Sequence, residues 1–251
     1  ISTSYQASPF NATWKTLNVE AVPSDAAAVV TVNEGAGEGA STFTGGSFEI
    51  ENTGSVPIES ASFDVSTAYM PDVVFDPAGT AGDAGAKCLT ADNGGSTTGF
   101  VSPGDPCTDP FSQPHNGTDS ENGFDVMSMS FNDFQNGESF AFSADLDPLS
   151  IKDQTDTGDA GKISGFEMIG STITVEFANG DTHTANLWDE GSLGGSQAVV
   201  APDLPQAPSI GVQAVSPPAT VSGQDQTIEV TGPANATVSL LQVDARLYID
   251  Q

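Results

Sequence analysis

Basic residues are scarce in this chain. Only 5 of its 251 residues are Lys or Arg, against 34 Asp and Glu, and the formal net charge is -29. A protein that binds nucleic acid needs a stripe of Lys and Arg along the phosphates, so the composition excludes that class of partner. Anionic membrane surfaces are disfavoured for the same reason. No apolar run reaches the ~18 residues that span a bilayer, so we expect no membrane insertion.

Sequence motifs of catalysis are also missing. The chain has two histidines, His115 and His183, and contains neither a G-x-S-x-G nucleophile elbow nor an H-E-x-x-H metal motif. Its many Ser and acidic residues allow a catalytic triad or a glycosidase pair to be drawn in numerous ways, so no single pairing is informative. We therefore interpret the protein as non-catalytic and expect His115 in a loop and His183 on a strand surface.

Cysteine is limited to Cys88 and Cys107, which lie in a segment rich in Gly, Pro and Ser. Their spacing does not fit a zinc site, so the choice is between a disulfide and two buried free thiols. We favour a disulfide, which persists in extracellular proteins and would close a long loop. A loop of this size predicts a stabilisation of roughly 3 kcal/mol.

Two further features fit an extracellular, cell-surface protein. Asn-X-Ser/Thr triplets at Asn11, Asn116 and Asn235 are compatible with a secreted glycoprotein. The chain opens without Met, at Ile1, which we interpret as a mature or trimmed start.

The most regular pattern in the sequence lies between Gly123 and Ile151. Apolar and polar residues alternate over 124–131 and again over 139–146. A period of two is typical of strands that have one face in a core and one in water. Asn136-Gly137 between the two segments is a strong hairpin signal, so we expect these strands to pair with each other.

Other strands are indicated by similar alternation and β-branched runs. Asp25-Ala-Ala-Ala is the only short helix signal, and the Val-rich 29–32 that follows it favours a strand. The remaining expected strands are 41–52, 58–66, 162–170, 171–177 and 182–188. Short turns join neighbouring strands, which predicts antiparallel sheets. The expected fold is an all-β, jelly-roll-like antiparallel β-sandwich, followed by a partial immunoglobulin-like β module.

Composition shifts predict the domain boundaries. We expect one sandwich domain over 1–201, with a long disulfide-pinned loop at 76–122. Three prolines make 202–208 a linker, and 209–251 holds too few residues for a complete immunoglobulin-like module. The natural chain is expected to continue into further β modules. The extended N-terminal arm can pack on its own domain, which we favour, or on a neighbour's sheet. Edge strands and incomplete modules suit strand exchange with other copies or with neighbouring modules.

Acidic loops at strand ends make calcium the expected cofactor. Calcium takes six to eight oxygen ligands, which Asp, Glu and backbone carbonyls of loops supply. The preferred ligands are Asp145, Asp147 and Asp153, because a strand end holds the first two rigidly. A second candidate set is Asp119, Glu121 and Asp125. The alternative for each loop is a solvated turn, since Asp is common in turns without a metal.

Aromatic residues offer a different function, carbohydrate binding. Sugar-binding sandwiches use exposed rings together with Asp, Asn and often calcium. The candidates in this chain are Trp14 and Trp188, with Tyr69 and Tyr248 as further rings. Trp188 is equally compatible with a place in the core.

Three stretches give the chain a wider resemblance. They are the Asn52-Thr53-Gly54 turn, the block GFDVMSMSFNDFQNGESFAFSADLDP, and the linker 202–208 leading to SPPATVSGQDQTIEVTGPANATV. In these the chain resembles secreted multidomain surface proteins of bacteria and archaea, adhesin-like chains of jelly-roll and immunoglobulin-like modules. The resemblance implies adhesion, assembly into a filament, or glycan binding.

Overall fold

The computed structural model describes residues 2–5, 15–17, 25–35, 37, 39–117, 120–154, 161–191, 193–202, 226–229 and 238–240. The chain divides into two units. One is the continuous segment Pro23–Pro202, and the other joins Ile1–Val22 with Asp203–Gln251.

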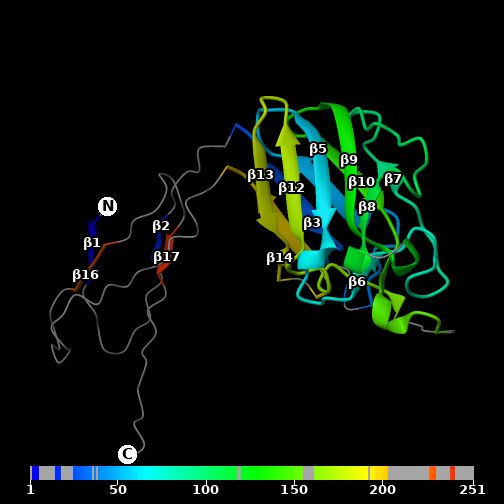
Figure 1. Ribbon diagram of the computed structural model, residues 1–251. Coiled ribbons are helices and arrows are strands. Elements are labelled where there is room, and N and C mark those ends of the chain that lie inside the picture. Colours follow the sequence, from blue (N-terminus) through cyan, green and yellow to red (C-terminus); the bar gives the residue numbers. More distant parts are fainter. Residues whose placement is uncertain are drawn as a thin grey trace, which may run out of the picture. The chain divides into compact units, whose positions relative to one another are not determined.

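The unit Pro23–Pro202 consists of two antiparallel sheets. The six-stranded sheet has the order β14 (Trp188–Asp189), β15 (Ser196–Val200), β3 (Ala28–Val32), β4 (Phe48–Asn52), β10 (Ser139–Ser143), β7 (Thr90–Asn93). The seven-stranded sheet has the order β11 (Leu146–Pro148), β6 (Val73–Phe75), β9 (Phe124–Phe134), β5 (Ile58–Asp64), β12 (Thr172–Phe177), β13 (Thr182–Asn186), with β8 (Phe111–Pro114) paired to β9. Figure 1 shows β12, β5 and β9 in one layer and β3 and β10 in the layer behind.

The expectation of an all-β antiparallel sandwich is thus confirmed. No α-helix occurs among the described residues, whose short 3-10 turns include η1 (Val65–Thr67), η2 (His115–Gly117), η3 (Ser120–Asn122) and η4 (Leu149–Ile151). The sequence after Asp25 carries both a helix signal and a strand signal, and the structure has the strand β3. Its β-branched residues alternate between buried and half-buried positions.

Phenylalanine rings fill the space between the sheets. Phe48 of β4 and Phe142 of β10 are register partners in the six-stranded sheet, and their rings stack at 4.7 Å. Phe63 of β5, in the opposite sheet, meets both rings edge to face at 5.7 and 5.5 Å. All three side chains are fully buried. Aromatic pairs of this geometry stabilise beyond their buried area, so this trio ties the two layers together.

The predicted hairpin between β9 and β10 is wrong. Gly137 does turn the chain, with a φ of 75°, but the two strands belong to different sheets. Phe140 of β10 pairs with Ile50 of β4, whereas β9 pairs along its length with β5. Phe131 and Phe140 then face each other across the core at 5.2 Å. Both strands carry large apolar faces, and packing these faces against each other buries more than a two-stranded ribbon would.

The strand predicted over 162–170 is also wrong, because this segment runs in turns. Gly165 lies against the backbone of Val32 and Ser196, where an added Cβ would overlap the Val32 carbonyl. Ile163 and Met168 are nevertheless buried in the core. The apolar residues of the segment therefore pack against one edge of the core, although the segment does not form a strand of either sheet.

The long loop at 76–122 contains two strands and one cross-link. β7 and β8 lie within it, and the disulfide Cys88–Cys107 joins the segment just before β7 to the turn that precedes β8. The Leu89 amide also donates to the Pro106 carbonyl, at 3.2 Å. The predicted disulfide is therefore present, and the segment is ordered through pairing with β9 and β10.

The second unit consists of paired strands from the two ends of the chain. β1 (Ser2–Tyr5) pairs with β16 (Gln226–Glu229), and β2 (Lys15–Leu17) pairs with β17 (Val238–Leu240), both antiparallel. Sequence patterns had placed the N-terminal residues with the sandwich. The predicted boundaries at 201, 208 and 209 stay a prediction, because most of this unit lies outside the described residues.

Candidate functional site

Asp145 and Asp147 lie where the chain crosses from one sheet to the other. β10 ends at Ser143 in the six-stranded sheet, and β11 begins at Leu146 in the seven-stranded sheet. The Asp145 amide donates to the Lys87 carbonyl at 3.0 Å, and its own carbonyl accepts from the Asp76 amide at 3.0 Å. Leu146 packs in the core between the two acids, and only 5% of Asp145 and 1% of Asp147 is exposed.

A third buried acid, Asp76, organises the loop beside them. It follows β6 directly and is 1% exposed. Its Oδ1 accepts from the Thr80 amide at 2.9 Å, and its Oδ2 accepts from the Ala81 and Gly82 amides at 2.7 and 3.0 Å. Three hydrogen bonds from backbone amides hold a carboxylate charge well, so Asp76 fixes the path of residues 77–82.

The loop that Asp76 holds lies against Asp147. An added Cβ on Gly82 would overlap Cβ and Cγ of Asp147, so only glycine fits at this contact. The next turn is closed by Asp83, whose Oδ1 accepts from the Gly85 amide at 2.5 Å. A Cβ on Gly85 would lie 3.7 Å from Oδ2 of Asp145. Four acids, Asp76, Asp83, Asp145 and Asp147, therefore gather at one edge of the sandwich; we call them the carboxylate cluster.

Three oxygens of the carboxylate cluster are buried without a hydrogen-bond partner. They are Oδ2 of Asp145 and both carboxylate oxygens of Asp147. A buried charge without a partner costs several kcal/mol in a protein interior. Such a group must take up a proton, bind a cation or lose stability.

The electrostatics of the cluster follow from burial and from like charge. Burial, with added repulsion from Asp147, Asp76 and Asp83, raises the pKa of Asp145 to about 8, and Lys87 opposes this shift. Burial, with repulsion from Asp83 and Asp76, raises the pKa of Asp147 to about 7. The Asp83 backbone N–H also lowers the pKa of Asp147 and the Asp76 side chain raises it, although neither group has the geometry of a hydrogen bond to the Asp147 oxygens.

Within the described ranges, no three His, Cys, Asp or Glu side chains have their ligand atoms gathered as around a bound metal. The oxygens of Asp76 already accept from loop amides, which leaves them less free for a cation than those of Asp145 and Asp147. The donor set is nevertheless made of oxygen alone, which suits a hard cation and not zinc.

The other predicted metal ligands lie elsewhere. Asp153 is exposed in a left-handed turn, with a φ of 65°, after η4. Glu121 is exposed on η3, and its carbonyl accepts from Nζ of Lys152 at 2.6 Å. Asp119 lies outside the described residues. The structure thus brings Asp145 and Asp147 together with Asp76 and Asp83, two loop acids for which the sequence offered only proximity to cysteine.

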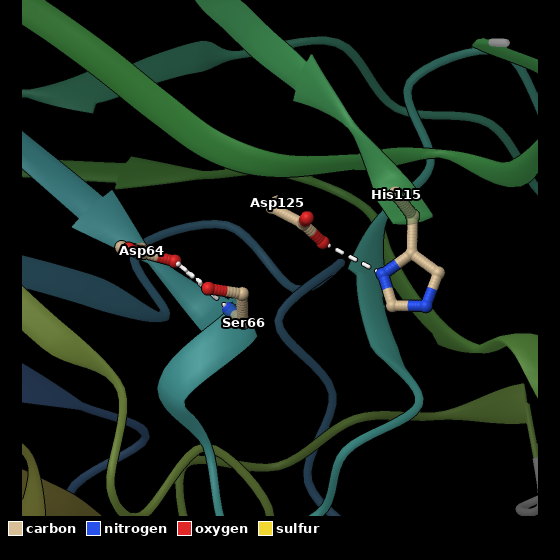
Figure 2. A network of polar contacts seen from close by, with 4 residues as sticks. All are labelled: Asp64, Ser66, His115 and Asp125. Atoms are coloured by element: carbon tan, nitrogen blue, oxygen red, sulfur yellow. Dashed lines mark hydrogen bonds and ion pairs between the residues drawn. The ribbon is translucent and has the colours of Figure 1, made fainter. Parts of the chain in front are cut away.

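Asp125 has a different partner, His115. The two side chains meet at 2.7 Å between Nδ1 and Oδ1, and His115 is 8% exposed. Figure 2 shows the Nε2 edge of the ring facing away from Ser66, whose hydroxyl donates to Asp64 at 2.6 Å. A triad would need that edge to face the nucleophile, so Ser66, His115 and Asp125 do not form one.

The outer face of the six-stranded sheet carries one row of cross-strand partners. Trp188 pairs with Gln197, Gln197 with Thr31, and Thr31 with Glu49. Direct partners in antiparallel strands point to the same side, so these four side chains form a strip, and we call it the outer row. An open polar cavity of about 500 Å³ adjoins its far end and is lined by Thr31, Glu49 and Asn33. Polar side chains thus line this end of the outer row, and the Trp188 indole lies at the other end.

Trp188 is exposed, which resolves the alternative of a core position. It is 55% exposed and meets Tyr69, itself 67% exposed, with ring centroids 5.9 Å apart and planes at 71°. The other proposed ring, Trp14, lies outside the described residues, as do the sequons at Asn11 and Asn235. Asn116 is exposed on η2 and is accessible to a glycan.

Comparisons of this chain with protein-family models, with curated proteins and with solved structures found no match. The part of the chain that the structure describes contains no helix with the length and apolarity of a membrane span. The fold therefore defines the class, an all-β protein with two packed antiparallel sheets.

Proposed function

We propose that the protein is a non-catalytic structural or adhesive module of an extracellular cell-surface or filament-forming protein, stabilised by calcium. The acidic composition, the disulfide and the adhesin-like resemblance support this proposal. Disulfides of this kind persist in oxidising compartments, and strong like charge keeps neighbouring chains soluble in salt.

One observation carries the proposal: strands from the two ends of the chain pair with each other. β1 with β16 and β2 with β17 form separate two-stranded sheets among the described residues. A two-stranded sheet alone is at best marginally stable in water, so such strands gain from further partners. The same pairs can form between the N-terminal strands of one copy and the C-terminal strands of the next, as in donor-strand complementation. Repeated head to tail, that exchange gives a filament.

Cross-linking tests strand exchange directly. Thr3 and Ile228 are register partners, and partner Cα atoms in antiparallel strands lie about 4.5–5.5 Å apart, within disulfide range. Chains with Thr3→Cys are mixed with chains with Ile228→Cys, oxidised mildly and mapped by mass spectrometry. We expect disulfide-linked dimers that contain one chain of each kind, and polymers in electron micrographs of the unmodified protein.

An out-of-register pair is the control. Gln226 pairs with Tyr5, so Thr3→Cys mixed with Gln226→Cys should cross-link at least tenfold less. If cross-links arise only within a Thr3→Cys/Ile228→Cys double variant, and if no polymers form, the chain completes its own sheet and the assembly proposal is wrong.

The outer row favours a second function, carbohydrate binding. The row offers an exposed indole beside amide, hydroxyl and carboxylate groups, and Gln197 donates to the Thr31 hydroxyl at 3.3 Å. The Asn33 amide nitrogen, buried next to the adjoining cavity, has no hydrogen-bond partner. An apolar ring with a few fixed polar groups is the usual composition of a site for a small polar ligand.

A glycan array separates the two functions. Carbohydrate binding predicts saturable binding that falls at least tenfold in Trp188→Ala, equivalent to about 1.4 kcal/mol. Val199→Ala is the matched control, because Val199 is 58% exposed on β15 of the same sheet. An array without hits, together with polymers, favours the structural function alone.

A further inference from the structure

We propose that Asp145, Asp147 and Asp83 bind a calcium ion that fixes the loop over residues 76–87 to the edge of the sandwich. This inference specifies the calcium site of the proposed function. It rests on the proposed extracellular location, where calcium is available. The sequence predicted Asp145, Asp147 and Asp153 as ligands, and this proposal replaces Asp153 with Asp83.

The first support is the burial of unpartnered carboxylate oxygens. Asp147 is 1% exposed and neither of its oxygens has a hydrogen-bond partner; Oδ2 of Asp145 is in the same position. These oxygens face the loop, because Gly82 touches Asp147 and Gly85 approaches Oδ2 of Asp145. Lone pairs that are withdrawn from water need a cationic or proton-bearing partner.

The nearest basic side chain does not supply that partner. Nζ of Lys87 donates to the Phe43 carbonyl at 2.6 Å and lies 5.1 Å from the centre of the Phe43 ring. Its charge acts on Asp145 only from a distance, and burial outweighs it. A metal ion would reach the unpartnered oxygens that Lys87 does not contact.

Each acid of the cluster has a separate part in this scheme. The carboxylate oxygens of Asp76 accept hydrogen bonds from the Thr80, Ala81 and Gly82 amides, so Asp76 shapes the loop and is not a ligand. Asp83 is half-exposed, and its Oδ1 accepts a hydrogen bond from the Gly85 amide. The proposal requires the Asp83 carboxylate to turn towards Asp147 when the ion binds, which would make it the third acidic ligand, and it requires loop carbonyls or water as the remaining oxygen ligands.

The chemistry of these donors selects calcium. All of them are oxygen atoms, and they come from the segment between β10 and β11 and from the loop that follows β6. Calcium accepts six to eight oxygens in flexible geometry, whereas magnesium demands a near-ideal octahedron and holds its waters tightly. We therefore expect calcium to bind at least tenfold more tightly than magnesium.

Calorimetric titration and thermal melting of the complete chain test the site. The protein is treated with chelator at pH 8, then titrated with calcium chloride or with magnesium chloride. Saturating calcium should raise Tm by about 5 °C or more. Asp147→Asn should lose one bound calcium per chain and at least half of the rise in Tm. Asp153→Asn is the matched control and should keep both.

The Asp147→Asn variant also reports on its own folding. Because the amide removes one of two adjacent buried charges, this variant should melt at or above the wild type in chelator. Asp83→Asn, at a half-exposed residue, is the second variant and should weaken calcium binding at least tenfold. The inference is overturned if calcium does not bind, if Asp147→Asn and Asp83→Asn bind as the wild type does, or if Asp153→Asn alone loses the ion. None of these outcomes depends on cross-linking between chains, so a failure of this site and a failure of assembly are distinguishable.

Discussion

Asp145 and Asp147 flank Leu146 in the segment that carries the chain between the two sheets, and both are more than nine-tenths buried. Leu146 between them packs in the core, as the alternation of an extended segment requires. The core packing of Leu146 thus anchors the segment between the two sheets and keeps the two neighbouring acids out of water. In the absence of a bound cation, the two carboxylates can be neutralised only by taking up protons.

Stability of the metal-free protein should therefore fall as pH rises. The pKa values of Asp145 and Asp147 are about 8 and about 7 in the folded chain, against 3.8 in an unfolded one. Between pH 4 and 8 the folded state holds protons that the unfolded state has released, so the free energy of unfolding declines with pH. The decline from this pair is on the order of several kcal/mol. Urea unfolding in chelator at a series of pH values measures it.

A double variant isolates the contribution of this pair from those of Asp76, Asp83, Lys87 and the other charged groups. In Asp145→Asn/Asp147→Asn neither group titrates, so the difference in unfolding free energy between wild type and variant should change steeply from pH 4 to 8. A difference that stays constant over this range would mean that both acids titrate normally in the folded chain. Saturating calcium should flatten the wild-type curve, because the bound ion replaces the protons.

Replacing Asp76 by Ala should destabilise the protein by about 3 kcal/mol, because three amides lose a charged acceptor and two of the bonds are buried. Asp189→Ala is the control. Its carboxylate accepts from the Gly191 amide at 2.8 Å in an exposed turn, and its loss should cost no more than about 0.5 kcal/mol. Equal losses in the two variants, measured by urea unfolding, would show that Asp76 is not a centre of loop order.

The sequence predicted most strands because periodicity and turn residues are local properties. The alternation over 124–131 became β9, and Asn179-Gly180 forms a true hairpin between β12 and β13. Sheet assignment is not local. Asn136-Gly137 has the same chemistry, yet its flanking strands enter different sheets because Phe131 and Phe140 pack across the core. Two equivalent turn signals can therefore lead to a hairpin or to a crossing between layers.

The carboxylate cluster was predictable only in part. Asp145 and Asp147 stood out because they alternate at the end of a strand. Asp76 and Asp83 were two among many loop acids, and nothing in their spacing foretold that β6 and β11 would pair. Contacts of this kind depend on long-range topology, which a single sequence does not display.

Removal of the disulfide should cost about 3 kcal/mol. Cys88 and Cys107 are 19 residues apart, and the loop-entropy relation gives this magnitude for a ring of that size. The Cys88→Ser/Cys107→Ser variant should unfold at lower urea concentration than the wild type, and limited proteolysis should cut first within 88–107. Wild-type protein treated with reductant should behave like the variant. A variant as stable as the wild type would show that pairing of β7 and β8 alone holds the loop.

Truncation of Phe142 should damage the core severely, because this ring touches aromatic neighbours from both sheets. It lies 4.7 Å from Phe48, 5.5 Å from Phe63 and 5.7 Å from Phe140, so Phe142→Ala leaves a cavity that both sheets line. Such a change typically costs about 3–5 kcal/mol. Phe166→Ala is the matched control, because that ring is 52% exposed and its loss should cost less than about 1 kcal/mol. If Phe142→Ala and Phe166→Ala shift the urea midpoint equally, the two layers are not held together by the aromatic trio.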